Sequence, residues 1–145
     1  MKLYKIALAS DHAGFNVKEK IRQYLQNKGH DIKDFGTFSS ESSDYPDFAH
    51  PMARAVENNE FVFGISFCGS GNGINMCANK YPGIRSAICW NPNIAELSRT
   101  HNDANICAIP ARFLSVEETK EIVDIFLNSE FEGGRHERRI NKIPI

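Results

Sequence analysis

The chain has 145 residues, of which 41% are hydrophobic and 24% are charged, and its formal net charge is −1. This length and composition predict a globular protein with one domain over residues 1–145 and a core of its own. The near-neutral charge gives no support for binding to nucleic acid or to a membrane surface, and no apolar run approaches the roughly 20 residues of a membrane helix.

Short apolar runs alternate with stretches of helical periodicity along the chain. The predicted strands cover residues 3–9, 30–35, 61–67, 84–89 and 104–109. The predicted helices cover residues 15–28, 48–59, 74–80, 91–100, 115–128 and, as a charged tail, 135–142. This alternation predicts an α/β fold: a single Rossmann-like, three-layer domain with a five-stranded parallel sheet and a C-terminal helical tail.

Local signals support two of the helix starts. Asn91 followed by Pro92 is typical of an N-cap with proline in the first turn. Ser115 followed three residues later by Glu118 forms a capping box, in which each side chain satisfies a backbone N–H of the other.

The most informative stretch is the apolar run of residues 61–67 and the glycine-rich loop after it. Cys68 ends the run, and the loop consists of Gly69, Ser70, Gly71, Asn72 and Gly73. Such a corner directs several backbone N–H groups toward one point and suits an anion. Cys68 precedes a helix N-terminus, a position that favours a thiolate, so it is a candidate nucleophile or general base.

Known phosphate motifs do not fit this loop. A Walker A loop needs Lys followed by Ser or Thr after its last glycine, and the dinucleotide pattern needs glycine one position later than Gly73. A cysteine phosphatase would need arginine six positions after Cys68, where Ile74 stands. With these three motifs excluded, the remaining interpretation is an anion-binding loop with a thiol beside it.

The other three cysteines, Cys77, Cys89 and Cys107, lie in apolar stretches and are expected to be core residues. No two cysteines form a CxxC pair, which argues against a zinc site and against a disulfide framework. Cysteine usage therefore predicts a reducing, cytoplasmic compartment.

Polar turns mark where a ligand would bind. In parallel sheets ligands lie beyond the carboxyl ends of the strands. Asp11 and His12 follow the first predicted strand, residues 68–73 the third, and Arg112 the fifth. The turn at residues 101–102 breaks this rule because it precedes the fifth strand, which suggests a site shared between subunits.

The C-terminal tail carries Arg135, Arg138 and Arg139, and the first and last of these share one face of a helix. Paired guanidinium groups suit a phosphate, although a solvated charge run is the commoner explanation of such a segment. His30 and His50 are expected at the surface. Together the groups favour acid/base chemistry on a small phosphorylated molecule, such as enolisation beside a carbonyl with the loop holding the oxyanion.

Six motifs follow one another in a familiar order: ASDHAGF (9–15), DYPDFA (44–49), FCGSGNGINMCANK (67–80), GIR (83–85), LSRTHNDANI (97–106) and FEGGRHERRI (131–140). In these motifs the chain resembles the ribose-5-phosphate isomerase B family, which also includes galactose-6-phosphate and allose-6-phosphate isomerases. The resemblance covers nearly the whole chain.

The resemblance implies an aldose–ketose isomerase that interconverts ribose 5-phosphate and ribulose 5-phosphate through an enediolate, as in the pentose phosphate pathway, with no metal or organic cofactor. On that pattern Cys68 moves the proton between C1 and C2. The backbone of residues 69–73, assisted by the Ser70 hydroxyl, forms the anion hole. His101 opens the sugar ring together with Asp11.

The resemblance also implies the remaining substrate contacts. His12, Arg135 and Arg139 would hold the phosphate with Arg112 nearby, and Tyr45 and Asn102 would contact the sugar. The family is homodimeric or homotetrameric, with His101 and some arginines reaching the partner's pocket. One branch uses a glutamate on the following helix as the base; here that neighbourhood is Ile74-Asn75, which leaves Cys68.

Three alternatives stay open at this point. The substrate could be a six-carbon sugar phosphate, such as allose or galactose 6-phosphate. The chain could instead be a non-catalytic module that senses a phosphorylated metabolite on the same loop. A thiol redox protein is disfavoured because Cys68 has no resolving cysteine beside it.

Overall fold

The computed structural model describes residues 2–145 and contains a five-stranded sheet. Its strands are β1 (Lys5–Ser10), β2 (Asp31–Asp34), β3 (Phe63–Cys68), β4 (Ser86–Ile88) and β5 (Ile106–Pro110). Their spatial order is β2-β1-β3-β5-β4, and each neighbouring pair is parallel. The predicted α/β fold class with a five-stranded parallel sheet is confirmed.

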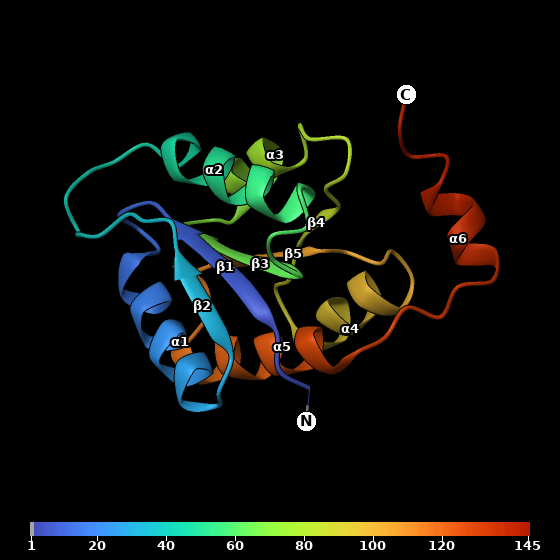
Figure 1. The fold of residues 1–145 in the computed structure, drawn as a ribbon. Helices are drawn as coiled ribbons and strands as arrows, with labels where there is room; N and C mark the ends of the chain where they lie inside the picture. The colour runs from blue at the N-terminus through green and yellow to red at the C-terminus, as the bar shows by residue number, and fades with distance from the viewer. Residues whose placement is uncertain (1) are drawn as a thin grey trace.

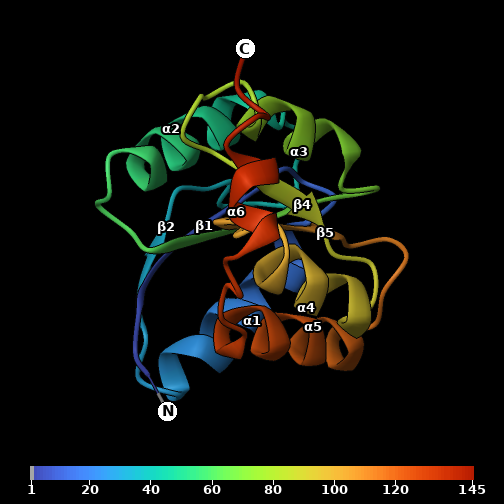
Figure 2. The same ribbon diagram turned by 90° about the vertical axis from the view of Figure 1, so that its right-hand side faces the viewer.

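Helices cover both faces of the sheet. They are α1 (Phe15–Asn27), α2 (Pro46–Glu57), α3 (Asn72–Ala78), α4 (Pro92–Thr100), α5 (Val116–Asn128) and α6 (Arg135–Ile140). Figure 1 shows α2 and α3 on one face and α1, α4 and α5 on the other. The predicted helical tail is α6, which stands outside these layers on the side where the strands begin (Figures 1 and 2).

Strand β3 lies at the centre of the sheet and is buried along its whole length. Phe63, Ile65 and Phe67 pack into the core beneath α1 and α5. Because side chains alternate along a strand, Cys68 points to the other face, where it packs against residues of α2, α3 and β5. This alternation places the thiol under α3 and the glycine loop.

The boundary signals in the sequence act as expected. The Ser115 hydroxyl accepts from the N–H of Glu118 at 3.1 Å, and Glu118 accepts the N–H of Ser115 at 3.0 Å. Asn91 Oδ1 accepts from the N–H of Ile94 at 2.8 Å. Most boundaries nevertheless differ from prediction, by one or two residues. For example, α2 begins two residues early at Pro46, whose fixed φ suits a first turn, and β3 extends to Cys68.

All four cysteines are reduced and buried, which confirms the expectation that Cys77, Cys89 and Cys107 are core residues. Burial raises the pKa of the Cys77 thiol and that of the Cys107 thiol. Within residues 2–145, no helix combines the length and the apolar character that crossing a bilayer requires.

The expectation that His30 and His50 are simple surface residues is wrong. His30 is buried, its ring stacks on Tyr4, and its Nδ1 accepts the N–H of Tyr4 at 3.1 Å. His50 is half-buried between the hydroxyl of Tyr81, 2.7 Å from its Nδ1, and the Sγ of Cys77, 3.3 Å from its Nε2. Neither contact follows from sequence periodicity.

Candidate active site

The glycine loop of residues 68–73 lies at the carboxyl end of β3, between β1 and β5. The residues after β5 run alongside it: Ala111 N–H donates to the carbonyl of Cys68 at 2.9 Å, and Arg112 N–H donates to that of Gly69 at 3.1 Å. The Arg112 side chain covers the loop, since a Cβ on Gly69 would lie 3.0 Å from its Nη1. The backbone of Arg112 is therefore fixed beside the loop, and its exposed side chain lies over Gly69.

The loop turns into α3 at Gly71, whose φ of 78° lies in the left-handed region that favours glycine. The N–H of Asn72 donates to Ser70 Oγ at 3.2 Å. Ser70 Oγ thus acts as an acceptor for the loop and keeps its own proton to donate to a ligand.

Cys68 is 5% exposed and packs against Ala49, Ile74 and Ala108. It lies beneath the loop, in apolar surroundings, rather than at the rim. A thiol in this position is shielded from bulk water.

Asp11 joins this edge through the neighbouring strand. Its N–H donates to the carbonyl of Phe67 at 3.3 Å, and its Oδ1 accepts from the N–H groups of Ala13 at 3.0 Å and Gly14 at 3.2 Å. Gly14 lies so close to β3 that a Cβ would sit 2.5 Å from the Phe67 oxygen. Oδ1 is committed to the turn, so Oδ2 is the oxygen that can act on a ligand.

His12 is oriented by Ser43, a residue that the sequence did not single out. The N–H of Ser43 donates to His12 Nδ1 at 3.1 Å, and the N–H of His12 donates to Ser43 Oγ at 3.1 Å. The carbonyl oxygen of Ser43 also lies 3.2 Å from Nδ1, but the backbone N–H can only donate, so it makes Nδ1 an acceptor. The proton of the neutral ring is then on Nε2. Nε2 can then donate to an anionic oxygen. Ser43 lies in an irregular polar loop, where periodicity gives no signal.

Tyr45 immediately precedes α2 and reaches the first turn of α3. A Cβ on Gly73 would lie 2.5 Å from Tyr45 Cζ and 2.8 Å from its hydroxyl oxygen. The absence of a side chain at Gly73 therefore makes room for the Tyr45 ring. The phenol hydroxyl closes one side of the loop.

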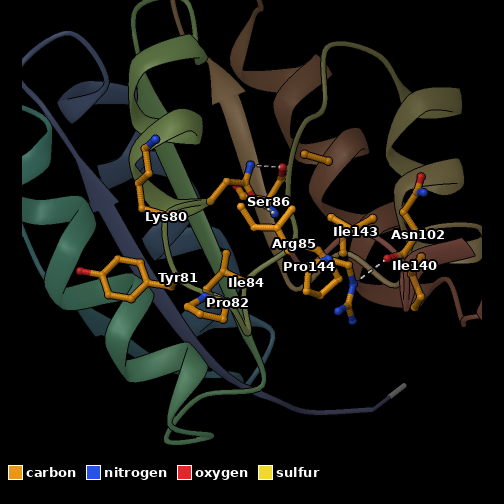
Figure 3. Close-up of a pocket in the computed structure, with 14 residues that line it drawn as sticks. Lys80, Tyr81, Pro82, Ile84, Arg85, Ser86, Asn102, Ile140, Ile143 and Pro144 are labelled. Carbon is orange, nitrogen blue, oxygen red and sulfur yellow. Dashed lines mark hydrogen bonds between the residues drawn. The ribbon is translucent and has the colours of Figure 1, made fainter.

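His101 and Asn102 lie at the opposite, amino-terminal edge of the sheet, as their order in the sequence predicts. They follow α4 and precede β5, whose five residues span roughly 16 Å at about 3.3 Å per residue. Arg85 fixes this turn, since its Nε donates to the carbonyl of Asn102 at 2.9 Å (Figure 3). Neither residue is brought near Cys68 within one chain.

The ring of His101 stacks on that of His136 in α6, with centroids 4.1 Å apart and planes 15° from parallel. Burial lowers the pKa of His136, and the charges of His101 and Arg135 lower it further. Glu132 Oε1 lies 3.5 Å from His136 Nε2. The sequence analysis did not identify Glu132 and His136 as functional residues, although the spacing of four residues between them is visible in the sequence.

Arg135 and Arg139 project from the exposed side of α6 at this same edge. A cavity of about 740 Å³ lies nearby, between the C-terminal residues 140–145 and the connection from α3 to β4. Asn102 and Arg85 line it (Figure 3), and none of the residues around Cys68 does.

The predicted site residues thus fall into two groups. The carboxyl-edge group contains Asp11, His12, Tyr45, Cys68, Gly69, Ser70, Gly71, Asn72, Gly73 and Arg112. The amino-edge group contains His101, Asn102, Arg135 and Arg139. The structure brings together the members of each group and separates the two groups by the length of the sheet.

Known proteins resemble this chain over almost its whole length. The family model described as Ribose/Galactose Isomerase matches residues 6–143. Ribose-5-phosphate isomerase B of Escherichia coli (strain K12) is 45% identical over 139 residues, which cover 96% of this chain and 93% of the relative.

Solved structures agree with this. A ribose 5-phosphate isomerase from Thermotoga maritima superposes with a TM-score of 0.96 at 51% identity, covering 97% of both chains. Ribose-5-phosphate isomerase B from Mycoplasma genitalium, with bound ribulose-5-phosphate, superposes with a TM-score of 0.92 at 41% identity, covering 96% of this chain and 93% of that one. These matches confirm the resemblance seen in the motifs and the predicted class of enzyme, an aldose–ketose isomerase. The chain belongs to the Ribose/Galactose Isomerase family.

Proposed function

We propose that this protein interconverts ribose 5-phosphate and ribulose 5-phosphate, with Cys68 as the base. The observation that carries the proposal is the buried Cys68 thiol beneath a glycine loop, with the Asp11 turn on one side and Arg112 on the other. The Escherichia coli and Mycoplasma genitalium relatives, one of them bound to ribulose-5-phosphate, support this choice of substrate.

In the proposed mechanism, the Cys68 thiolate removes the proton from C2 of the open-chain aldose. The electron pair forms the C1–C2 double bond of an enediolate, whose oxyanion on O1 accepts hydrogen bonds from the Ser70 hydroxyl and from loop N–H groups within residues 69–73. The N–H of Asn72 is not one of them, because it donates to Ser70 Oγ. The Cys68 thiol then returns the proton to C1. The O2 hydroxyl gives up its proton to become the ketose carbonyl, and the O1 oxyanion takes up one proton to become a hydroxyl. The product is the ketose, and no redox partner is required.

The carboxyl-edge group contains only part of this machinery, because opening of the sugar ring would need His101 together with Asp11, and His101 lies at the other edge. We infer that His101 and Asn102 of a second subunit face it, together with Arg135 and Arg139. His12, through Nε2–H, and Arg112 would share the phosphate with these arginines, while Tyr45 would contact the sugar. A homodimer with a two-fold axis would form two such sites, and a homotetramer would contain two such dimers.

The proposed chemistry needs acid/base groups and hydrogen-bond donors, and no metal or organic cofactor takes part in it. Cys68 must remain reduced to act as a base. A reducing, cytoplasmic compartment therefore suits this mechanism.

Replacing Cys68 with alanine tests the proposal. Removal of a general base costs about 10²- to 10⁴-fold in rate, so we expect kcat on ribose 5-phosphate to fall by that range. Cys77→Ala is the matched control, because Cys77 is also a buried thiol of the same hydrophobic cluster and has no part in the mechanism. Near-wild-type turnover by Cys68→Ala would rule out Cys68 as the base.

Six-carbon sugar phosphates are the second candidate substrates, because the description of the family model names galactose as well as ribose. Turnover of ribose 5-phosphate, allose 6-phosphate and galactose 6-phosphate by the same preparation would decide between them. Thermal stabilisation by a sugar phosphate without turnover would instead indicate a binding module.

A further inference from the structure

Three side chains with metal-ligating atoms meet at the amino-terminal edge of the sheet. His101 ends α4, Glu132 lies in the segment after α5, and His136 is in α6. One ligand atom from each lies within 4.8 Å of the other two. The segment is tied to α4 because the N–H of Glu132 donates to the carbonyl of Thr100 at 3.0 Å. The cluster is therefore held by the backbone.

The burial and the unpaired nitrogen of His136 are a second, independent indication of a ligand. Its side chain is buried, with 7% of the residue exposed, and its Nε2 has no hydrogen-bond partner among residues 2–145. Buried polar atoms are nearly always paired, because an unpaired one loses its interaction with water without replacement. The closest carboxylate oxygen, on Glu132, lies 3.5 Å away, which leaves Nε2 able to bind a metal ion.

Two imidazoles and one carboxylate form a ligand set that suits Zn²⁺ and leaves a fourth position for water. Metal–ligand distances of about 2.0–2.2 Å would bring the ligand atoms to about 3.4 Å from one another. The stacked rings must rotate about χ2 to direct their lone pairs at one ion. This torsion is soft, and His101 is only half-buried.

The surrounding charges act in opposite directions. The carboxylate of Glu132 attracts a cation, whereas Arg135 and Arg139 on the same short helix repel it. We therefore expect weaker binding than at a structural zinc site, in keeping with a site that fills and empties as the metal concentration changes.

We propose that His101, Glu132 and His136 form an inhibitory site for Zn²⁺ and similar late first-row divalent ions. Imidazole selects such ions over Mg²⁺, which prefers oxygen ligands. Metal binding itself does not depend on the proposed function. Its effect on turnover does, because a metal-bound His101 cannot open the sugar ring, so Zn²⁺ should compete with the sugar phosphate.

Calorimetric titration of the intact, metal-free protein with Zn²⁺ tests the binding. We expect Glu132→Gln and His136→Asn each to raise the dissociation constant at least about tenfold. Glu130→Gln is the matched control, because Glu130 is exposed and lies two residues from Glu132. Cys77→Ala controls for binding at the Cys77–His50 pair, and neither control should weaken binding. Wild-type affinity in both test variants would overturn the site.

Inhibition is measured with the same proteins. Zn²⁺ should raise the apparent KM for ribose 5-phosphate in the wild type, Mg²⁺ should not, and Glu132→Gln should need at least about tenfold more Zn²⁺ for the same effect. Equal inhibition of Glu132→Gln and wild type would overturn the inhibitory role and would implicate another ligand, such as Cys68. Variant-sensitive Zn²⁺ binding in a protein inactive on every sugar phosphate would support the metal site and contradict the proposed function.

Discussion

The two groups of site residues are organised in different ways. The carboxyl-edge group lies at the ends of adjacent strands. Backbone hydrogen bonds of 2.9–3.3 Å link residues 11, 67–69, 111 and 112. The amino-edge group lies outside the sheet, in the turn before β5 and in α6. Backbone hydrogen bonds to α4 and the side chains of Arg85 and Arg99 hold the turn, and the ring stack of His101 and His136 holds α6. The sheet therefore builds the first group, whereas the second is presented outward from a turn and a short helix, as a contribution to a partner would require.

A methyl group at Gly14 should cause the largest loss of stability. Gly14→Ala would place Cβ 2.5 Å from both Cβ and the carbonyl oxygen of Phe67, and a central strand cannot move aside easily. We expect unfolding in urea to show a loss of about 3 kcal/mol or more, together with a loss of activity.

Gly69→Ala is the matched comparison within the same edge. Its Cβ would meet the flexible end of Arg112 at 3.0 Å, so we expect a much smaller loss of stability. If the two variants were equally stable, the carboxyl edge would not be as tightly fixed by β3 as the structure indicates.

Arg99 provides the corresponding test for the amino edge. Its Nη1 donates to the carbonyl of Ala104 at 2.7 Å and to Asp103 Oδ1 at 2.9 Å, and its guanidinium lies over the ring of Phe63. Arg99→Met keeps an apolar stem but removes these donors, and we expect a loss of about 2 kcal/mol in urea-induced unfolding.

Arg22→Met is the control for that experiment. Arg22 pairs with Glu19 at 2.7 Å on the surface of α1, where ion pairs contribute about 0–1 kcal/mol. A similar small loss for Arg99→Met would mean that the turn carrying His101 is held by something other than Arg99.

The smallest predicted effect concerns pH. Burial, followed by the positive charge of Lys28, lowers the pKa of His30 in the folded chain. Unfolded histidine titrates near about 6.5, so the folded state binds this proton less readily, and the stability contribution present above that pH is lost as the pH falls below it.

His30→Asn tests this linkage, because the amide oxygen can accept the N–H of Tyr4 without titrating. Urea midpoints at pH 7.5 and 5.5 should differ less in this variant than in the wild type. The pKa of His136 is also lowered, so the stability of the His30→Asn variant should still fall somewhat between pH 7.5 and pH 5.5. An unchanged difference between the two pH values would contradict the assignment to His30.

The fold could be predicted largely from sequence because strand and helix periods, the Ser115 capping box and the Asn91 cap are local signals. The position of Cys68 at a strand end followed from the apolar run before it. Contacts made across irregular segments could not be predicted in this way. Ser43 orients His12 from a polar loop, and His136 meets His101 only after α5 and the following segment have folded back along α4.

The central claim is that each catalytic site combines the carboxyl edge of one subunit with the amino edge of another. Cys68→Ala and His101→Asn should each be inactive, and each retains the group that the other lacks. After subunit exchange of an equal mixture, a dimer should regain about one quarter of wild-type turnover, because half of the molecules are mixed and each mixed dimer has one intact site of two. Exchange verified by mass spectrometry without recovery of turnover would contradict the shared site.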